Sequence, residues 1–204
     1  MDMLDKPQRI MLPQRLETGS ALLQSCIRQR RSVRSFRDRS LTINDLGQLL
    51  WAAQGITEAD GRRSVPSAGA LYPLELYAVI GQVSGLAPGV YRYLATSDEI
   101  VLIAHGFQRG KLAEAARGQE WISTAATVVC VAAVFARTTV RYGARGRGYV
   151  YMEAGHAAQN LMLEAVELGL GTTMVGAFND ETVSCLLHLS AEETPLCLLP
   201  VGVP

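Results

Sequence analysis

Lysine is nearly absent from this sequence of 204 residues, which contains only Lys6 and Lys111 beside seventeen arginines. The formal net charge is zero. A nucleic-acid-binding protein commonly has an excess of positive charge and aromatic side chains that stack on bases, so this composition argues against that class. Because the arginine guanidinium holds a planar oxyanion through two parallel N–H groups, the bias towards arginine favours sites for such anions.

Cysteine is scarce and scattered. No C-x-x-C pair occurs among Cys26, Cys130, Cys185 and Cys197. His156 follows Glu153 by three residues, but no second histidine lies at the helical spacing that a zinc site would require. The sequence therefore predicts no metal site and no disulfide framework, and we expect buried, reduced thiols.

Long apolar runs and common nucleotide motifs are also absent. The apolar run at 125–136 is shorter than a membrane-spanning helix, and residues 1–12 lack the apolar core of a signal peptide. We therefore expect a cytoplasmic protein that does not contact a membrane. No G-x-G-x-x-G follows a predicted strand, and neither a P-loop nor a G-x-S-x-G motif occurs. These absences disfavour a Rossmann nucleotide site, a P-loop enzyme and a serine hydrolase.

The chain has the length of one substantial domain. We expect residues 1–18 to form an irregular leader and residues 19–204 a single domain. Apolar periodicity predicts helices at 20–31, 42–53, 110–116, 149–168 and 179–187. Apolar and β-branched runs predict strands at 74–80, 89–94, 99–104, 125–135, 170–178 and 195–201. The alternation of helices and strands favours a layered α/β arrangement.

Four of these elements carry more detailed predictions. Thr42 and Asp45 resemble a capping box at the start of a helix, and Asn179 is expected to cap the helix that ends at Leu187. The continuous apolar run at 125–135 is typical of a strand that is covered on both faces. The helix at 149–168 is apolar on most sides and rich in small residues, which predicts a position in the core or at a dimer interface.

A loop of small residues precedes the strand at 74–80. It contains Pro66, Ser67, Ala68, Gly69 and Ala70. Small side chains let a backbone approach a large flat molecule, and proline stiffens the chain. The loop is suited to a planar cofactor whose polar edge meets backbone N–H and C=O groups, although an ordinary tight connection would have the same composition.

Six arginines lie between Arg28 and Arg39, at the end of the first predicted helix. Within this cluster, the segment Arg30-Arg31-Ser32-x-Arg34 combines guanidinium groups with a hydroxyl group. This mixture of charge and hydrogen-bond donors is suited to a phosphate group. An exposed basic helix end is the alternative.

A polar, basic, glycine-rich segment occupies residues 141–149. We expect a loop there, either a mobile surface loop or a lid over a site. In a lid, Tyr142 could donate a proton to a substrate.

Taken together, these motifs resemble the nitroreductase-like FMN-dependent oxidoreductases, and most closely their SagB-type dehydrogenase branch. Four motifs in order carry the resemblance, which runs from about residue 26 to the end. They are Arg30-Arg31-Ser32-x-Arg34-x-Phe36, the loop 66–75, the helical Glu153-Ala154-Gly155-His156-x-x-Gln159-Asn160-Leu161 with Gly169-Leu170-Gly171, and Pro200-Val201-Gly202.

The resemblance implies a fold and a cofactor site. The fold would be α+β with three α/β/α layers, in which helices flank a mostly antiparallel sheet and the long helix lies at the interface of a homodimer. FMN would bind between the subunits. Its phosphate would lie near Arg30, Arg31, Ser32 and Arg34. Its ring would lie against Pro66, Ser67, Ala68, Gly69 and Ala70, with Tyr72 nearby and with Val175 and Gly176 on the other side.

The resemblance also implies a chemistry, in which flavin N5 takes a hydride from a donor such as NAD(P)H and passes reducing equivalents to a small-molecule acceptor such as a quinone or nitro compound. Azoline-oxidising members have a Lys-Tyr pair where this chain has Arg141 and Tyr142, and arginine cannot give up its proton as lysine can. Azoline oxidation in a peptide-modifying system and a non-catalytic flavin-binding module remain the alternative functions.

Overall fold

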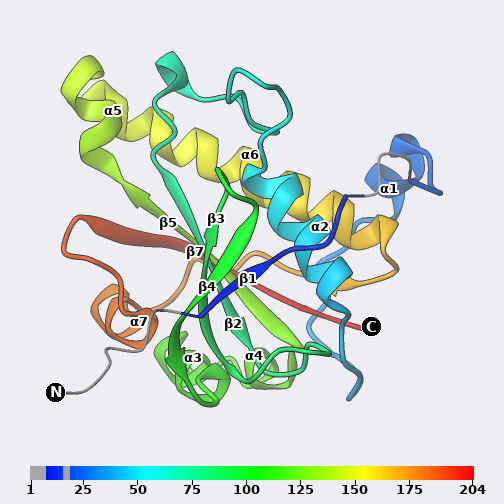
Figure 1. Cartoon of the computed structure of the whole chain (residues 1–204). Coiled ribbons are helices and arrows are strands. Elements are labelled where there is room, and N and C mark those ends of the chain that lie inside the picture. Colours follow the sequence, from blue (N-terminus) through cyan, green and yellow to red (C-terminus); the bar gives the residue numbers. More distant parts are fainter. Residues whose placement is uncertain (1–7, 16–18) are drawn as a thin grey trace, which may run out of the picture.

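The computed structural model describes residues 8–15 and 19–204. Seven strands form one sheet in the order β1-β4-β3-β2-β5-β7-β6, and helices lie on both of its faces (Figure 1). All six pairs of neighbouring strands are antiparallel. The strands are β1 (Arg9–Met11), β2 (Leu74–Ile80), β3 (Gly89–Leu94), β4 (Glu99–His105), β5 (Thr127–Val134), β6 (Gly171–Thr172) and β7 (Glu193–Gly202).

Two apolar cores separate the sheet from its helical layers. The helices are α1 (Leu23–Gln29), α2 (Ile43–Gln54), α3 (Arg109–Ala115), α4 (Trp121–Thr124), α5 (Phe135–Tyr142), α6 (Arg145–Glu167) and α7 (Asp180–Leu187), with a short 3₁₀ turn, η1 (Ala68–Ala70). Residues of α2 and α6 pack in one core, and residues of α3, α4 and α7 pack in the other. The expected three-layer α+β arrangement is confirmed.

The continuously apolar sequence of β5 is explained by its position between two cores. Val129 and Val131 belong to the core under α2 and α6, whereas Val128 and Cys130 belong to the opposite core. Successive side chains of a strand point to opposite faces, so a strand with helices on both sides needs apolar residues at every position. All eight residues of β5 are buried, as the sequence predicted.

Two sequence predictions about the helix starts are confirmed. Thr42 accepts a hydrogen bond from the backbone N–H of Asp45 at 3.1 Å, and the Asp45 carboxylate accepts one from the backbone N–H of Thr42 at 2.8 Å. Asn179 caps α7 by accepting a hydrogen bond from the backbone N–H of Thr182 at 2.8 Å. Each cap satisfies a donor that the first helical turn leaves without a partner.

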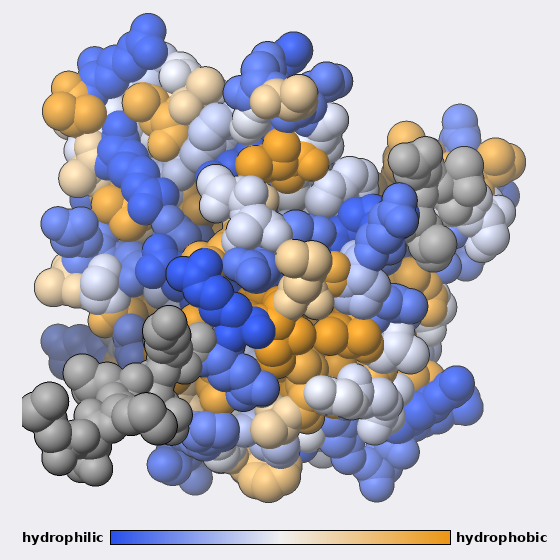
Figure 2. Space-filling view, viewed as in Figure 1, coloured by the Kyte–Doolittle hydropathy of each residue, from blue (hydrophilic) through white to orange (hydrophobic). Residues whose placement is uncertain are grey.

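Two expectations about irregular segments were wrong. Within the expected leader 1–18, residues Arg9–Met11 form β1, which pairs with β4 at the edge of the sheet; residues 1–7 and 16–18 lie outside the described part of the chain. On the face shown in Figure 2, an apolar area lies near β1 and α2 with hydrophilic residues around it. Strand β1 thus adds an edge strand to the sheet that the sequence pattern did not predict.

The second wrong expectation is the loop at 141–149. Helix α5 continues to Tyr142 and α6 begins at Arg145, so only Gly143 and Ala144 connect them. A Cβ atom on Gly146 would lie 3.0 Å from the Cα of Thr139 and 3.1 Å from the carbonyl oxygen of Thr138. This glycine serves the close packing of two helices, and the glycine content of the segment does not indicate mobility.

The long helix α6 is buried on one side and exposed on the other within a single chain. Ala154, Ala157 and Leu161 belong to the core. Met152 is 54% exposed, and the outer face also presents Tyr151, Gly155, His156 and Gln159. In the described part of the chain, no helix combines the length and apolar character needed to cross a membrane.

Candidate functional site

The arginine segment lies along the edge of the sheet that β6 forms. Ser32 pairs with Thr172 of β6 as a parallel bridge, and the backbone N–H of Val33 donates to the carbonyl oxygen of Thr172 at 3.0 Å. A Cβ atom on Gly171 would lie 2.7 Å from Val33, so this glycine permits the close contact. The backbone of the segment is therefore fixed to the sheet, and its side chains project from that edge.

The guanidinium groups of this segment lie at the surface. Arg31 donates from Nη1 to the carbonyl oxygens of Arg28 at 2.7 Å and Arg30 at 2.8 Å. Arg34 lies 5.9 Å from the centre of the Trp121 ring. Within residues 8–15 and 19–204, no ion pair involves Arg30, Arg31 or Arg34. The segment thus presents positive charge that the described acidic residues do not neutralise.

Val175 and Gly176 lie on the same edge. Val175 pairs with Leu198 of β7, with an N–H to carbonyl distance of 2.8 Å in one direction and 2.9 Å in the other. Val175 is buried, whereas Gly176 is exposed, and a Cβ atom there would have no neighbour within 4 Å. Open space therefore lies directly over the backbone at Gly176, next to the strand that holds Ser32.

The small-residue loop forms a second group of predicted site residues, at a different place. Its backbone adopts positive φ at Gly69 (64°), Ala70 (54°) and Tyr72 (45°). Two side-chain acceptors help to hold it: Ser67 Oγ accepts from the backbone N–H of Tyr72 at 2.9 Å, and Glu153 Oε1 accepts from the backbone N–H of Ala68 at 2.8 Å. Residues with side chains rarely adopt positive φ without such support, so the loop is held in one defined conformation.

Sequence reasoning gave Glu153 no role in the site, although it named the residue beside His156 and at the start of the third family motif. Its side chain is 4% exposed and lies on the inner side of α6. Burial raises the pKa of this carboxyl group, and the hydrogen bonds from Ala68 and Ser67 oppose that rise. An acidic residue among alanines on the buried face of a helix was the signal that could have identified it.

Tyr142 lies against this loop. A Cβ atom on Gly69 would be 2.9 Å from the Tyr142 hydroxyl oxygen and 2.8 Å from Arg141 Nη1. The Tyr142 ring packs edge-on against Tyr149, with ring centres 5.2 Å apart. The structure therefore brings Tyr142 to the exposed side of Gly69, although from the end of a helix and not from the expected loop.

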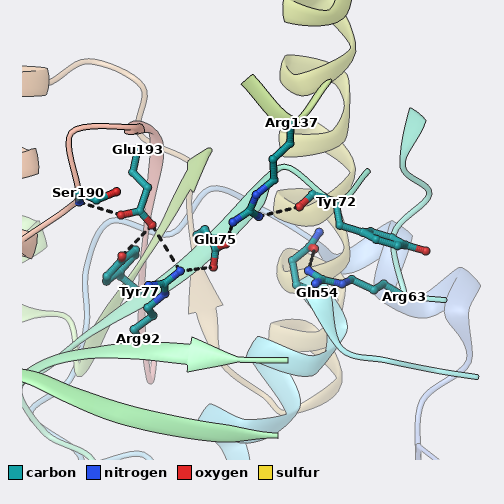
Figure 3. Close-up of polar contacts among 9 residues, drawn as sticks. All are labelled: Gln54, Arg63, Tyr72, Glu75, Tyr77, Arg92, Arg137, Ser190 and Glu193. Carbon is teal, nitrogen blue, oxygen red and sulfur yellow. Dashed lines mark hydrogen bonds and ion pairs between the residues drawn. The ribbon is translucent and has the colours of Figure 1, made fainter. Parts of the chain in front are cut away.

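An ion-pair network lies below the loop (Figure 3). Arg137 donates to the carbonyl oxygen of Tyr72 at 3.0 Å and to Glu75 Oε1 at 2.6 Å. The other oxygen of Glu75 lies 3.1 Å from Arg92 Nη2, and Arg92 lies 3.8 Å from Glu193 Oε1. Sequence reasoning did not identify Arg92, Arg137 or Glu193, since these residues are far apart along the chain.

The two groups of predicted site residues do not meet within one chain. The loop contacts α6 at Glu153, whereas Glu167, the last residue of α6, accepts hydrogen bonds from the backbone N–H groups of Ser20 and Ala21 before α1. Fourteen residues of helix separate these contacts, which corresponds to about 21 Å. Figure 1 shows α1 beyond the end of α6 that is distant from α5. Ser32 bridges Thr172, which closely follows the end of α6, so the arginine segment lies near that end, whereas the loop and Tyr142 lie towards the start of the helix.

Comparisons with known proteins agree on one family. The model of the nitroreductase family matches residues 27–203. The chain is 45% identical over 180 residues to "Putative nitroreductase MJ1384" of Methanocaldococcus jannaschii, covering 88% of this chain and 90% of that protein.

Solved structures show the same fold. A "putative nitroreductase" from Anabaena variabilis aligns with a TM-score of 0.85 and 28% identity over 97% of this chain and 42% of that chain. The Escherichia coli microcin synthetase McbBCD complex, solved with truncated pro-MccB17 bound, contains a chain that aligns with a TM-score of 0.74 and 23% identity. That alignment covers 100% of this chain and 78% of the other, and at this identity it shows the fold alone.

Proposed function

The chain belongs to the nitroreductase family, and from this premise we propose that it is an FMN-dependent oxidoreductase. It would pass reducing equivalents from NAD(P)H to a small organic acceptor such as a quinone or a nitro compound. The observation that carries the proposal is the convergence of the arginine segment, Val175 and Gly176 on one exposed edge of the sheet.

This edge has the chemistry that the FMN phosphate requires. Arg30, Arg31 and Arg34 supply positive charge, and the Ser32 hydroxyl can donate a hydrogen bond to a phosphate oxygen. The bridge between Ser32 and Thr172 fixes the position of the backbone before any ligand arrives. A site whose backbone is already ordered loses less conformational entropy on binding.

The open space over Gly176 and the small side chains of the loop are suited to the flat ring of the cofactor. The ring would supply the redox chemistry. The chain's own contribution would be to hold it: Val175 is fixed by its two hydrogen bonds to Leu198, and Glu153 fixes the Ala68 end of the loop. Tyr142, over Gly69, would donate a proton to the substrate from its hydroxyl group.

A complete site of this kind would require two copies of the chain, because the arginine segment and the small-residue loop lie at separate positions along α6. A two-fold axis near the middle of α6 would place the loop end of one copy beside the arginine end of the other. The exposed face of α6 supports this homodimer, since Tyr151 and Met152 are large hydrophobic residues that are each about half exposed in a single chain. Gly155 on that face would allow close approach, because it has no side chain.

The visible spectrum of the purified protein, before and after anaerobic addition of NADPH, tests the proposal. We expect a yellow protein that absorbs at roughly 450 nm, as flavins do, and that NADPH bleaches. A colourless protein that takes up no added FMN would refute it. Flavin that neither NADH nor NADPH reduces, without turnover of quinones or nitroaromatics, would indicate the non-catalytic flavin-binding module instead.

The dimer has its own test. Met152→Glu would place a charge in the proposed interface, so we expect light scattering to show a monomer and FMN retention to fall. Phe107→Glu is the matched control, because Phe107 is an exposed apolar residue after β4 and does not lie on α6. A dimer that persists in the Met152 variant would contradict this arrangement.

Azoline oxidation on a peptide is the second candidate function, and its support is the resemblance of the Arg141-Tyr142 pair to the Lys-Tyr pair of azoline-oxidising family members. The position of Arg141 and Tyr142 over Gly69 is where such a pair would act. Because Arg141 keeps its proton, Tyr142 or a water molecule would have to act as the base. Turnover of a synthetic thiazoline peptide, with none of quinones or nitroaromatics, would favour this function.

A further inference from the structure

A cavity of about 250 Å³ lies below the small-residue loop, and three arginines line it. They are Arg63, Arg92 and Arg137, and Glu75 is the acidic residue in the lining. Including Glu193, which lies 3.8 Å from Arg92, the group still has three positive charges and two negative ones. We refer to it as the arginine cavity.

The charge of Arg63 is the least compensated of the three. Its Nη1 donates to the neutral amide oxygen of Gln54 at 2.8 Å, and its guanidinium lies 4.7 Å from the centre of the Tyr72 ring (Figure 3). Arg63 forms no ion pair with any described acidic residue. Burial lowers the pKa of Arg63, as expected for a cation that is partly removed from water.

Arg92 also has an unused donor. Its Nη2 lies 3.1 Å from Glu75 Oε2, but its Nε is buried and has no hydrogen-bond partner among the described residues. A buried N–H group without an acceptor is unfavourable, and an acceptor from a ligand would relieve this cost. Arg63 and Arg92 therefore offer free donors around one cavity, whereas Arg137 is held by Tyr72 and Glu75.

We propose that the arginine cavity binds the carboxylate or phosphate group of a small molecule. The volume is sufficient for such a group, since a water molecule occupies about 30 Å³ in the liquid. Arg63 touches the Tyr72 ring and Arg137 holds the Tyr72 carbonyl, so a bound anion would lie against the small-residue loop. The site is separate from the arginine segment at 30–34, and anion binding there does not depend on whether the chain uses FMN.

Calorimetric titration at low ionic strength tests this site, with inorganic phosphate and citrate as separate ligands. To exclude anion binding at the arginine segment 30–34, the titration is done with saturating FMN, which would occupy that segment. If the protein takes up no FMN, the titration uses the Arg31→Ala variant, in which that segment is weakened. Arg63→Gln is expected to weaken binding at least about tenfold, because it removes a charge-assisted contact. The tighter ligand identifies the class of anion.

Arg62→Gln is the matched control. Arg62 is the preceding residue, is exposed and pairs with Asp60, so its removal should leave the affinity unchanged. In the parent protein, NMR should also show the Nε–H signals of Arg63 and Arg92 moving as the anion is added. The proposal would be overturned if neither phosphate nor citrate bound at roughly 10 mM. It would also be overturned if the Arg62 and Arg63 variants changed the anion affinity equally.

Discussion

The carboxylate of Glu153, on the buried side of α6, accepts a hydrogen bond from the backbone N–H of Ala68 at 2.8 Å. This contact joins the longest helix to the small-residue loop across 85 residues of sequence. The hydrogen bond gives the backbone N–H of Ala68 an acceptor. It also keeps a carboxyl group away from water, which is unfavourable for its ionised form.

This arrangement predicts a pH dependence of stability. Burial raises the pKa of Glu153 above its ordinary value of 4.5 in the folded state. A raised folded-state pKa favours the protonated form, so the contribution of Glu153 to stability is fully present below 4.5 and is lost as pH rises through the raised value. Glu153→Gln keeps an acceptor oxygen but cannot ionise. We therefore expect its melting temperature, relative to the parent protein, to be higher at pH 8 than at pH 4.

Glu58→Gln is the control for this measurement, because Glu58 is exposed in the loop after α2. Its melting temperature relative to the parent should stay constant over the same range. A Glu153→Gln variant that loses relative stability between pH 4 and pH 8 would show that the ionised carboxylate strengthens the fold.

The backbone conformation of Gly69 predicts that its substitution by alanine destabilises the protein. Its φ is 64°, and a Cβ atom there would be 2.8 Å from Arg141 and 2.9 Å from the Tyr142 hydroxyl oxygen. Left-handed backbone costs a residue with a side chain about 1–2 kcal/mol. Gly69→Ala should lower the free energy of unfolding in urea by about that amount. Gly110→Ala in α3, where a Cβ atom meets nothing within 4 Å, should cause no loss.

The arginine segment predicts an effect on cofactor retention. Arg31→Ala with Ser32→Ala should weaken FMN binding by roughly 10- to 100-fold, because hydrogen bonds to a charged phosphate are lost. Quenching of FMN fluorescence measures the affinity. Arg39→Ala is the matched control, since Arg39 is exposed but lies outside the segment 30–34. Equal affinities of the double variant and the parent would refute the phosphate assignment.

The position of Tyr142 predicts that its hydroxyl group affects the turnover rate but not the affinity for FMN. Tyr142→Phe removes the hydroxyl group over Gly69 but keeps the ring that packs on Tyr149. If this hydroxyl donates the proton, turnover of a quinone should fall by about 10²-fold or more, while FMN affinity is unchanged. Tyr149→Phe, which also preserves the ring pair, should retain turnover. A Tyr142→Phe variant with full activity would remove Tyr142 from the mechanism.

Local signals predicted much of the fold. The bounds of β2 and β3, the capping box of Thr42 and the cap of Asn179 agree with the sequence expectations. Each follows from neighbouring residues. The strands follow from runs of apolar and β-branched residues, and the caps follow from a side chain that reaches the nearby backbone. The three-residue β1 was missed because so short an edge strand exists only through its pairing with β4.

For the site, the sequence supplied the residue types and the tertiary structure supplied their positions. The sequence alone indicated an arginine segment, a small-residue loop and Tyr142 as a possible proton donor in a lid. Only the folded chain placed the first near the end of α6 and the other two towards its start. It also revealed Glu153 and the arginine cavity. Motifs depend on residues that are adjacent along the chain, whereas buried charges and ion pairs depend on strand register and helix packing, which no local pattern specifies.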